Sequence, residues 1–270
     1  MAKGSEEEPV LSEYGNQMVN KILGHHRDSQ AYLSSMEVSS RLSFGNEFGE
    51  FKGGMPKFEQ LSQPEKQRQC MIKLTYITTQ LIVEFAKKVP GFELLDVDKK
   101  VTNLKSAASE IMIIRTADRY QISDKKIQFQ DNSLVDRQAF NTLVSENANY
   151  VDPMFNWCDR MKRELQVDMT EICLLACICL FKPDRPGMIR DAGLDHVSFN
   201  NRMLAHYKNV LRAYQQQQHV KVKNKFERLL RELEELKGIA TEQNKMLHTF
   251  KKGMLPKLLG EELWSQHVQD

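Results

Sequence analysis

The stretch FAKKVPGFELLDVDKKVTNLK, residues 85–105, joins the end of one helix to the start of another. Pro90 cannot continue a helix and disfavours helical backbone at the residue before it, so the helix that carries Phe85 is predicted to end there. A second helix is predicted to begin at Asp96 or Asp98, since a carboxylate is favourable at a helix N-terminus.

Between and beside these helix ends, some residues are predicted to lie in the core and others on the surface. Phe92 and Leu95 are apolar and are predicted to return the chain to the core. Lys87 and Lys105 lie near the two ends of the unit, where we expect both to reach one surface patch.

Length and composition indicate a folded domain. The chain has 270 residues, of which 41% are hydrophobic, enough for a large core. The net charge of +2 gives no global field that would attract nucleic acid. The longest apolar run, around residues 172–181, is too short to span a bilayer, so we expect no membrane partner. Residues 1–8 are acidic, lack the apolar core of a signal peptide, and are expected to be a disordered lead-in.

Cysteine usage indicates a reducing compartment. The count of five is odd, and three cysteines (Cys173, Cys177 and Cys179) fall in one apolar segment. We interpret them as buried structural thiols, because no second Cys/His cluster with zinc spacing accompanies them. There is also no glycine-rich phosphate loop and no G-x-S-x-G motif, so an enzyme is not expected and a helical enzyme is the weakest alternative.

Helical periodicity dominates the rest of the chain. The predicted helices cover residues 11–33, 65–89, 97–120, a segment through Trp157, and residues 169–181, 196–214 and 222–250. One short β-hairpin is predicted where RYQI and KIQF flank Asp124-Lys125. A single all-α domain over residues 9–270 follows, with residues 34–64 as a long loop.

Arg115 is the most informative polar residue, because four apolar residues precede it in SEIMIIRTADRY. A guanidinium is rarely buried without a partner. Either it bonds backbone carbonyls or an internal carboxylate such as Glu110, or it grips an anionic or hydroxylated ligand. Thr75 and Thr78, one helical turn apart, either bond the carbonyl a turn back or add a polar spot to an apolar cavity.

The C-terminal piece LPKLLGEELW, with Pro256 in its first turn, is predicted to be a short amphipathic helix at about residues 256–265. Its leucines would also fit a tail that simply docks on the core. Glu261 and Glu262 are both candidates for a polar contact between this helix and a partner, and we favour Glu262.

Together these residues resemble the ligand-binding domain of nuclear receptors. The pattern F-A-K-x4-F-x2-L from Phe85, followed by Leu104 and Lys105, is similar to the family signature. Lys99-Lys100 and Asn103 depart from it, since the family usually has Asp-Gln and a leucine there. QLIVEFAKKVPGF and RTADRYQ are similar to ecdysone receptors, and the first helix to vitamin D receptors. This mixture is most similar to the nematode dauer-formation receptors for dafachronic acids, which are bile-acid-like steroids.

The resemblance implies an all-α fold: a three-layer antiparallel helical sandwich of about twelve helices with a small β-hairpin. It also implies a nuclear location, a steroid or sterol-acid ligand, and no other cofactor. A homodimer, or a heterodimer with a retinoid X receptor-like partner, would use the helix at 222–250. DNA would be bound only through a separate domain. The ligand contacts implied, with Arg115 at the acidic or oxygenated end, are Thr75, Thr78, Met71, Met112, Ile122, Phe129, Trp157, Gln243, Met246 and Leu247.

A coactivator groove is implied as well. A short LxxLL helix leaves unpaired N–H groups at its start and carbonyls at its end. Glu262 would cap the first, Lys87 and Lys105 the second, and Leu259 and Leu263 would contribute to the apolar groove between them. The rival interpretation is a constitutive interaction module whose cavity is filled by side chains.

Overall fold

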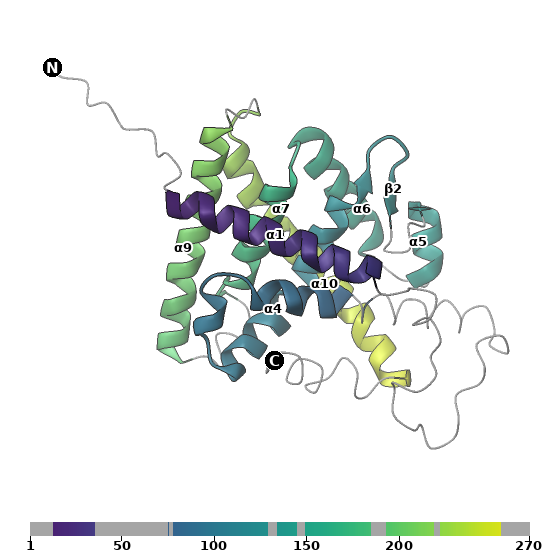
Figure 1. Ribbon diagram of the computed structural model, residues 1–270. Coiled ribbons are helices and arrows are strands. Elements are labelled where there is room, and N and C mark those ends of the chain that lie inside the picture. Colours follow the sequence, from purple (N-terminus) through teal and green to yellow (C-terminus); the bar gives the residue numbers. More distant parts are fainter. Residues whose placement is uncertain are drawn as a thin grey trace.

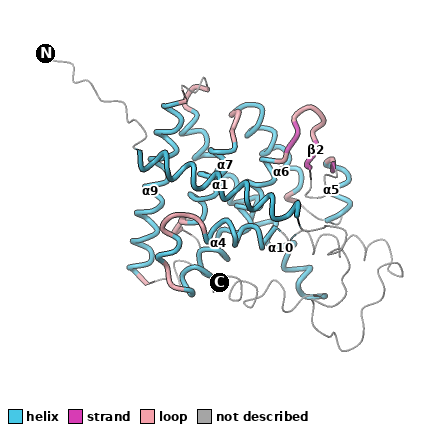
Figure 2. The backbone as a smooth tube through the Cα atoms, viewed as in Figure 1, coloured by secondary structure: helices cyan, strands magenta, loops and turns pink. Residues whose placement is uncertain are grey.

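A computed structural model describes residues 13–35, 75, 78–128, 134–144, 149–184, 193–218 and 222–254. This part of the chain is a three-layer helical sandwich with a small antiparallel sheet at one edge (Figures 1 and 2). Its long helices are α1 (Glu13–Ser35), α4 (Val97–Asp118), α9 (Leu194–Gln217) and α10 (Lys225–Met254), and its shorter ones are α5 (Arg137–Val144), α6 (Val151–Asp159) and α7 (Met169–Leu180).

α7 is at the centre of the fold. Every side chain from Thr170 to Leu180 is buried, because α1, α4 and α9 pack around this helix. α10 and α6 pack in turn against α4. In Figure 1, α1 crosses in front of this centre and α10 runs behind it. The apolar run near residues 172–181 is therefore a core helix. In the described ranges, no helix is both long and apolar enough to cross a membrane.

The helix end and the core residues predicted in the stretch at residues 85–105 are confirmed. The helical residues 78–87 end just before Pro90, and Gly91 takes a left-handed backbone with φ of 90°, which glycine adopts without strain. Phe92, in the 3-10 turn η2 (Phe92–Leu94), and Leu95 are 0% and 6% exposed, so both return to the core.

Asp96 rather than Asp98 is the N-cap of α4. Its Oδ1 atom accepts a hydrogen bond of 2.9 Å from the backbone N–H of Lys99, and the ammonium of Lys99 lies 2.6 Å from Oδ2. The cap satisfies one of the backbone donors that every helix start leaves unpaired.

The predicted hairpin is confirmed and is part of a larger sheet. β1 (Tyr120–Gln121) pairs antiparallel with β2 (Lys126–Gln128), with Tyr120 opposite Ile127. β3 (Leu134–Val135) then adds a third strand on the other side of β2. A two-residue strand has no periodicity of its own, which is why the sequence did not reveal it.

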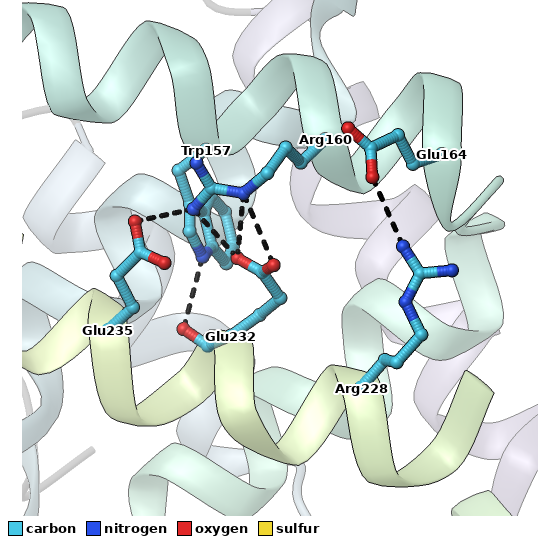
Figure 3. A network of polar contacts seen from close by, with 6 residues as sticks. All are labelled: Trp157, Arg160, Glu164, Arg228, Glu232 and Glu235. Carbon is cyan, nitrogen blue, oxygen red and sulfur yellow. Dashed lines mark hydrogen bonds and ion pairs between the residues drawn. The ribbon is translucent and has the colours of Figure 1, made fainter. Parts of the chain in front are cut away.

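The segment after α6 is fixed to α10 by a polar network (Figure 3). α6 continues as a π-helical turn, η3 (Arg160–Glu164), from which Arg160 and Glu164 reach α10. The indole N–H of Trp157 donates to the carbonyl of Glu232 at 3.1 Å. Arg160 donates to both carboxylate oxygens of Glu232, with its Nη2 at 3.0 Å from Oε2. Two further ion pairs, Arg160–Glu235 and Arg228–Glu164, extend the network along both helices.

A second network, buried between α4 and α9, contains Asn103, His196 and Asn200, which are all at most 2% exposed. The amides of Asn103 and Asn200 bond each other reciprocally at 3.1 Å. Nε2 of His196 lies 3.0 Å from Oδ1 of Asn103. Because that oxygen can only accept, the Nε2 atom must carry the hydrogen.

Folding stability is expected to fall as the pH drops below about 6.5, the pKa of an unperturbed histidine. The pKa of His196 is lowered by burial and by Lys99, while Asp96 opposes the shift. The unfolded chain therefore binds a proton more readily than the folded one, so acidification favours unfolding and neutral pH favours the native state.

Urea unfolding at about pH 7.5 and about pH 5.5 will measure this effect. His196→Gln is the control, since an amide can still donate to Asn103 but does not titrate. An identical loss of stability in both proteins would assign the pH dependence to other groups.

Candidate ligand-binding site

Arg115 lies in the last turn of α4 and is only 7% exposed, as its apolar neighbours predicted. Its Nη2 atom is buried and, among the described residues, has no hydrogen-bond partner. The pKa of Arg115 is lowered to about 10, first by burial and then by Arg119, while Cys173 and Asp118 act in the opposite direction. A pKa below the ordinary value means that the surroundings disfavour the charged form, as expected for a guanidinium without an adequate counter-ion.

Glu110, the internal carboxylate considered as a partner for Arg115, is directed to another site. It is buried on α4, five positions before Arg115 and so on a different side of the helix. Burial acts to lower the pKa of Lys182, but Cys179, Glu234 and Glu110 outweigh burial, so that the pKa lies above its ordinary value. Glu110 is thus an electrostatic neighbour of Lys182.

A second arginine increases the positive charge at this end of α4. Arg119 follows Arg115 by one turn, and burial lowers its pKa too, with Asp118 opposing. The carboxylate of Asp118 is also 3.8 Å from the ammonium of Lys162. Two arginines and a lysine therefore surround one carboxylate, an arrangement that favours an added anion.

Two more buried polar groups, which interact with each other, lie between α6 and α10. The Tyr150 hydroxyl, just before α6, and Oε1 of Gln243, on α10, lack hydrogen-bond partners of normal geometry among the described residues. Tyr150 is 1% and Gln243 6% exposed. Burial raises the pKa of Tyr150, and a side-chain hydrogen bond with Gln243 lowers it by a smaller amount. Nε2 of Gln243 lies 3.8 Å from Sδ of Met112, one turn before Arg115 on α4.

The sequence identified Gln243 and Met112 as candidates but missed Tyr150. A tyrosine at a helix start carries no periodic signal, and its neighbour Gln243 is far along the chain. Only the packing of α6 against α10 brings the two together.

Thr75 is buried and Thr78 half-buried in the segment that precedes Phe85. Each has an interaction within the chain, so neither is an unpaired polar group. Met246 and Leu247 are half-buried on α10, where Met246 packs against the core.

Two predicted lining residues lie where other roles account for them better. Ile122, in the turn after β1, is 45% exposed, which does not fit a cavity wall. Trp157 is 0% exposed and uses its N–H to hold α10, so it joins helices.

The predicted coactivator surface is described only in part. Lys87 is half-buried, with its ammonium 3.3 Å from Glu84, and Lys105 is exposed on α4. Leu259, Glu262 and Leu263, with the helix predicted at 256–265, lie outside the described residues, as do the ligand candidates Met71 and Phe129.

The cysteines of α7 are buried thiols, as predicted. Burial raises the pKa of Cys173 to about 12 and that of Cys177 well above its ordinary value. Thiols with such pKa values stay protonated at neutral pH and are poor nucleophiles. No group of three His, Cys, Asp or Glu side chains in the described part of the chain could hold a metal ion.

Comparison with known proteins shows the family of this chain. The profile of the ligand-binding domain of nuclear hormone receptor matches residues 57–252. The ecdysone receptors of Lucilia cuprina and Drosophila melanogaster are each 30% identical to this chain over 215 residues, which are 78% of this chain and 27% and 23% of those receptors. Nuclear hormone receptor E75 of Metapenaeus ensis is 31% identical over 171 residues, 63% of this chain and 27% of the relative.

The chain thus spans about a quarter of the length of these relatives. The profile covers most of the chain, including the signature stretch, the Arg115 helix and most of α10. The chain therefore belongs to the nuclear hormone receptor family, as its ligand-binding domain.

Proposed function

We propose that this domain binds a steroid that carries an acidic group, of the bile-acid-like class to which the dafachronic acids belong, and that Arg115 holds the acidic end. The observation that supports this most directly is the buried guanidinium with an unpartnered nitrogen. A carboxylate would supply both an added counter-ion and an acceptor for Nη2.

The ecdysone receptor relatives support an ecdysteroid as the alternative ligand, with a secosteroid as a further one. A hydroxylated, uncharged steroid would fill the acceptor role but leave the charge uncompensated. The excess of positive charge around Arg115 and Arg119 is the reason that we favour the acid. Thr75, Thr78, Met71, Met112, Phe129, Gln243, Met246 and Leu247 complete the proposed contacts.

The proposed readout is coactivator recruitment in the nucleus. Lys87 and Lys105 would cap the carbonyl end of an LxxLL helix and Glu262 its N–H end, with Leu259 and Leu263 beneath it. A ligand that steadies the C-terminal helix shifts the population towards the complete groove. α10 would supply the dimer surface for a second copy or for a retinoid X receptor-like partner, and a separate domain would contact DNA.

Arg115→Met is expected to weaken binding of a dafachronic acid by about tenfold to a hundredfold, the value of a charge-assisted hydrogen bond. The methyl ester of the same acid is the matched control. Esterification should cost the wild-type protein a comparable factor and should cost the variant little. Isothermal titration measures the four affinities, and fluorescence anisotropy of an LxxLL peptide reports recruitment alongside.

Equal affinities of the wild type and of a folded Arg115→Met variant would overturn the role of Arg115. Peptide binding that is tight without steroid and unchanged by it would instead support the constitutive module. Native mass spectrometry of the purified protein then shows directly whether the interior holds a ligand.

A further inference from the structure

Large apolar side chains gather at the surface around the starts of α4 and α9. Five large apolar residues of the described part of the chain are exposed, and three of them are here: Leu94, Val97 and Leu194. Leu94 is 73% and Leu194 89% exposed. Single exposed apolar residues are ordinary, whereas several on one surface indicate a contact that the isolated domain does not make.

The packing of α9 brings these residues to one end of the domain. Nε2 of His196 lies 3.0 Å from Oδ1 of Asn103, so the first turn of α9, which begins with Leu194, is fixed to α4. Further along α9, the Tyr207 hydroxyl donates to the carbonyl of Pro90 at 2.7 Å, in the turn that leads to Leu94. Figure 1 shows the start of α9 beside this turn, at the lower left.

The same surface is acidic. Its exposed carboxylates come from the turn and from the two helix starts: Glu93, Asp96, Asp98 and Asp195. Two half-buried lysines, Lys99 and Lys100, lie among them along the chain. Four carboxylates and two ammonium groups leave a local charge of −2 in a chain whose net charge is +2.

Carboxylates of both elements act on one lysine. The ammonium of Lys99 lies 2.6 Å from Oδ2 of Asp96. Asp96 raises the pKa of Lys99 most and Asp195 raises it further, while burial acts in the opposite direction. The carboxylate of Asp195, on α9, is therefore on the same surface as that of Asp96.

The helix dipole explains the acids but not the leucines. Acidic residues are favourable in the first turn of a helix, where Asp98 and Asp195 lie. An exposed leucine gains nothing from the dipole. Apolar side chains with a charged border instead match the anatomy of an interface. Because this border is negative, it repels nucleic acid and favours a partner whose apolar residues are bordered by lysine or arginine.

We propose that this surface binds a basic amphipathic segment of a partner protein, with apolar side chains against the leucines and lysine or arginine against the carboxylates. We name it the α4–α9 surface, formed by Glu93, Leu94, Val97, Asp98, Leu194 and Asp195. The contact requires neither a steroid nor the coactivator groove, so it is independent of the function proposed for Arg115.

Three short helical peptides of equal length test this proposal. The first has leucines four residues apart with lysines between them and contains no LxxLL sequence. The second has glutamate in place of each lysine, and the third has alanine in place of each leucine. Fluorescence anisotropy with the full chain is expected to show that the first binds at least about tenfold more tightly than the others. Added salt should weaken it several-fold.

Substitutions on the α4–α9 surface are expected to weaken the first peptide selectively. Leu94→Ser with Leu194→Ser should cost about tenfold or more in affinity, because two apolar contacts are lost. Glu93→Lys with Asp195→Asn should cost about three- to tenfold and reduce the dependence on salt. All four side chains are exposed, and thermal melts check that the variants fold.

Two controls locate the binding. Ile122→Ser with Leu134→Ser is the matched control, since these apolar residues are also exposed but lie at the small sheet, and the pair should leave affinity unchanged. Lys87→Ala should leave it unchanged too, because Lys87 belongs to the proposed coactivator groove.

Each contrary result overturns the proposal. Equal binding of the three peptides, or an equal loss in the control pair, removes the role of the α4–α9 surface. A loss with Lys87→Ala assigns the peptide to the coactivator groove. If sedimentation shows that the wild type dimerises and that Leu94→Ser with Leu194→Ser is monomeric, the partner is a second copy of this chain. None of these results bears on steroid binding by Arg115, which the titrations with dafachronic acid test separately.

Discussion

Replacing Lys225 with methionine is expected to lower the free energy of unfolding by about 3 to 5 kcal/mol. Lys225, the first residue of α10, is 6% exposed, and its Nζ atom lies 2.6 Å from Oε2 of Glu171. Glu171 is itself 0% exposed. The variant would leave a charged carboxylate in the interior without its counter-ion, which costs far more than the loss of a surface ion pair.

The loss is expected to be large because Glu171 joins three helix ends. Its Oε2 atom accepts from the backbone N–H of Asp168 at 3.0 Å, which completes the capping box of α7. Its Oε1 atom accepts from Gln215, near the end of α9, at 2.7 Å. Lys225 also donates to the carbonyl of Gln166 at 3.1 Å. A carboxylate that moves to find water would break contacts with α7, α9 and α10 together.

Urea unfolding followed by circular dichroism measures the change. Lys223→Met is the matched control, since Lys223 is exposed two positions earlier and its substitution should cost at most about 0.5 kcal/mol. The double variant Glu171→Leu with Lys225→Met should recover part of the loss, because no unpaired charge remains buried. If the two lysine variants are equally stable, the buried pair does not hold these helix ends together.

The sequence predicted the helices well, because their signals are local. Pro90 marks a helix end and Asp96 a helix start, and both act within a few residues. The burial of Arg115 could also be anticipated from its four apolar neighbours. β3 and the π-helical turn η3 could not, since two-residue strands and single wide turns depend on the elements that pack beside them.

The candidate site was predictable only where one residue carries the signal. Arg115 stands out because a charged residue follows four apolar ones. Tyr150 becomes informative only when the structure places it beside Gln243. Ile122 is apolar like a core residue, but it lies in a turn and is exposed. The partner of a buried polar group is set by tertiary packing, which a local pattern does not contain.

The departures from the family signature in residues 99–103 show the same limit. In the sequence, Lys99-Lys100 and Asn103 only weaken a match. In the structure, Lys99 pairs with the N-cap Asp96, and Asn103 has two partners on α9, so the unusual residue completes a network. A polar residue that replaces a buried leucine is tolerated where its partners are present.

Asn103→Leu, which restores the residue usual in the family, is therefore expected to destabilise this domain by about 2 to 5 kcal/mol. The substitution removes the hydrogen bonds that Asn103 makes with the Nε2–H of His196 and with the amide N–H and carbonyl of Asn200. Each buried group that loses its partner costs about 1 to 3 kcal/mol, and the apolar gain of one leucine offsets only part of that sum.

Lys100→Gln is the matched control for the same unfolding measurement, since it too restores a family residue but lies half-buried in the first turns of α4. We expect it to change stability by at most about 0.5 kcal/mol. Adding Asn200→Leu and His196→Phe to Asn103→Leu should recover stability, because the interface then contains no unpaired polar group. If Asn103→Leu alone is as stable as the wild type, the network is dispensable. The departure at Asn103 would then be a neutral substitution rather than one matched by changes on α9.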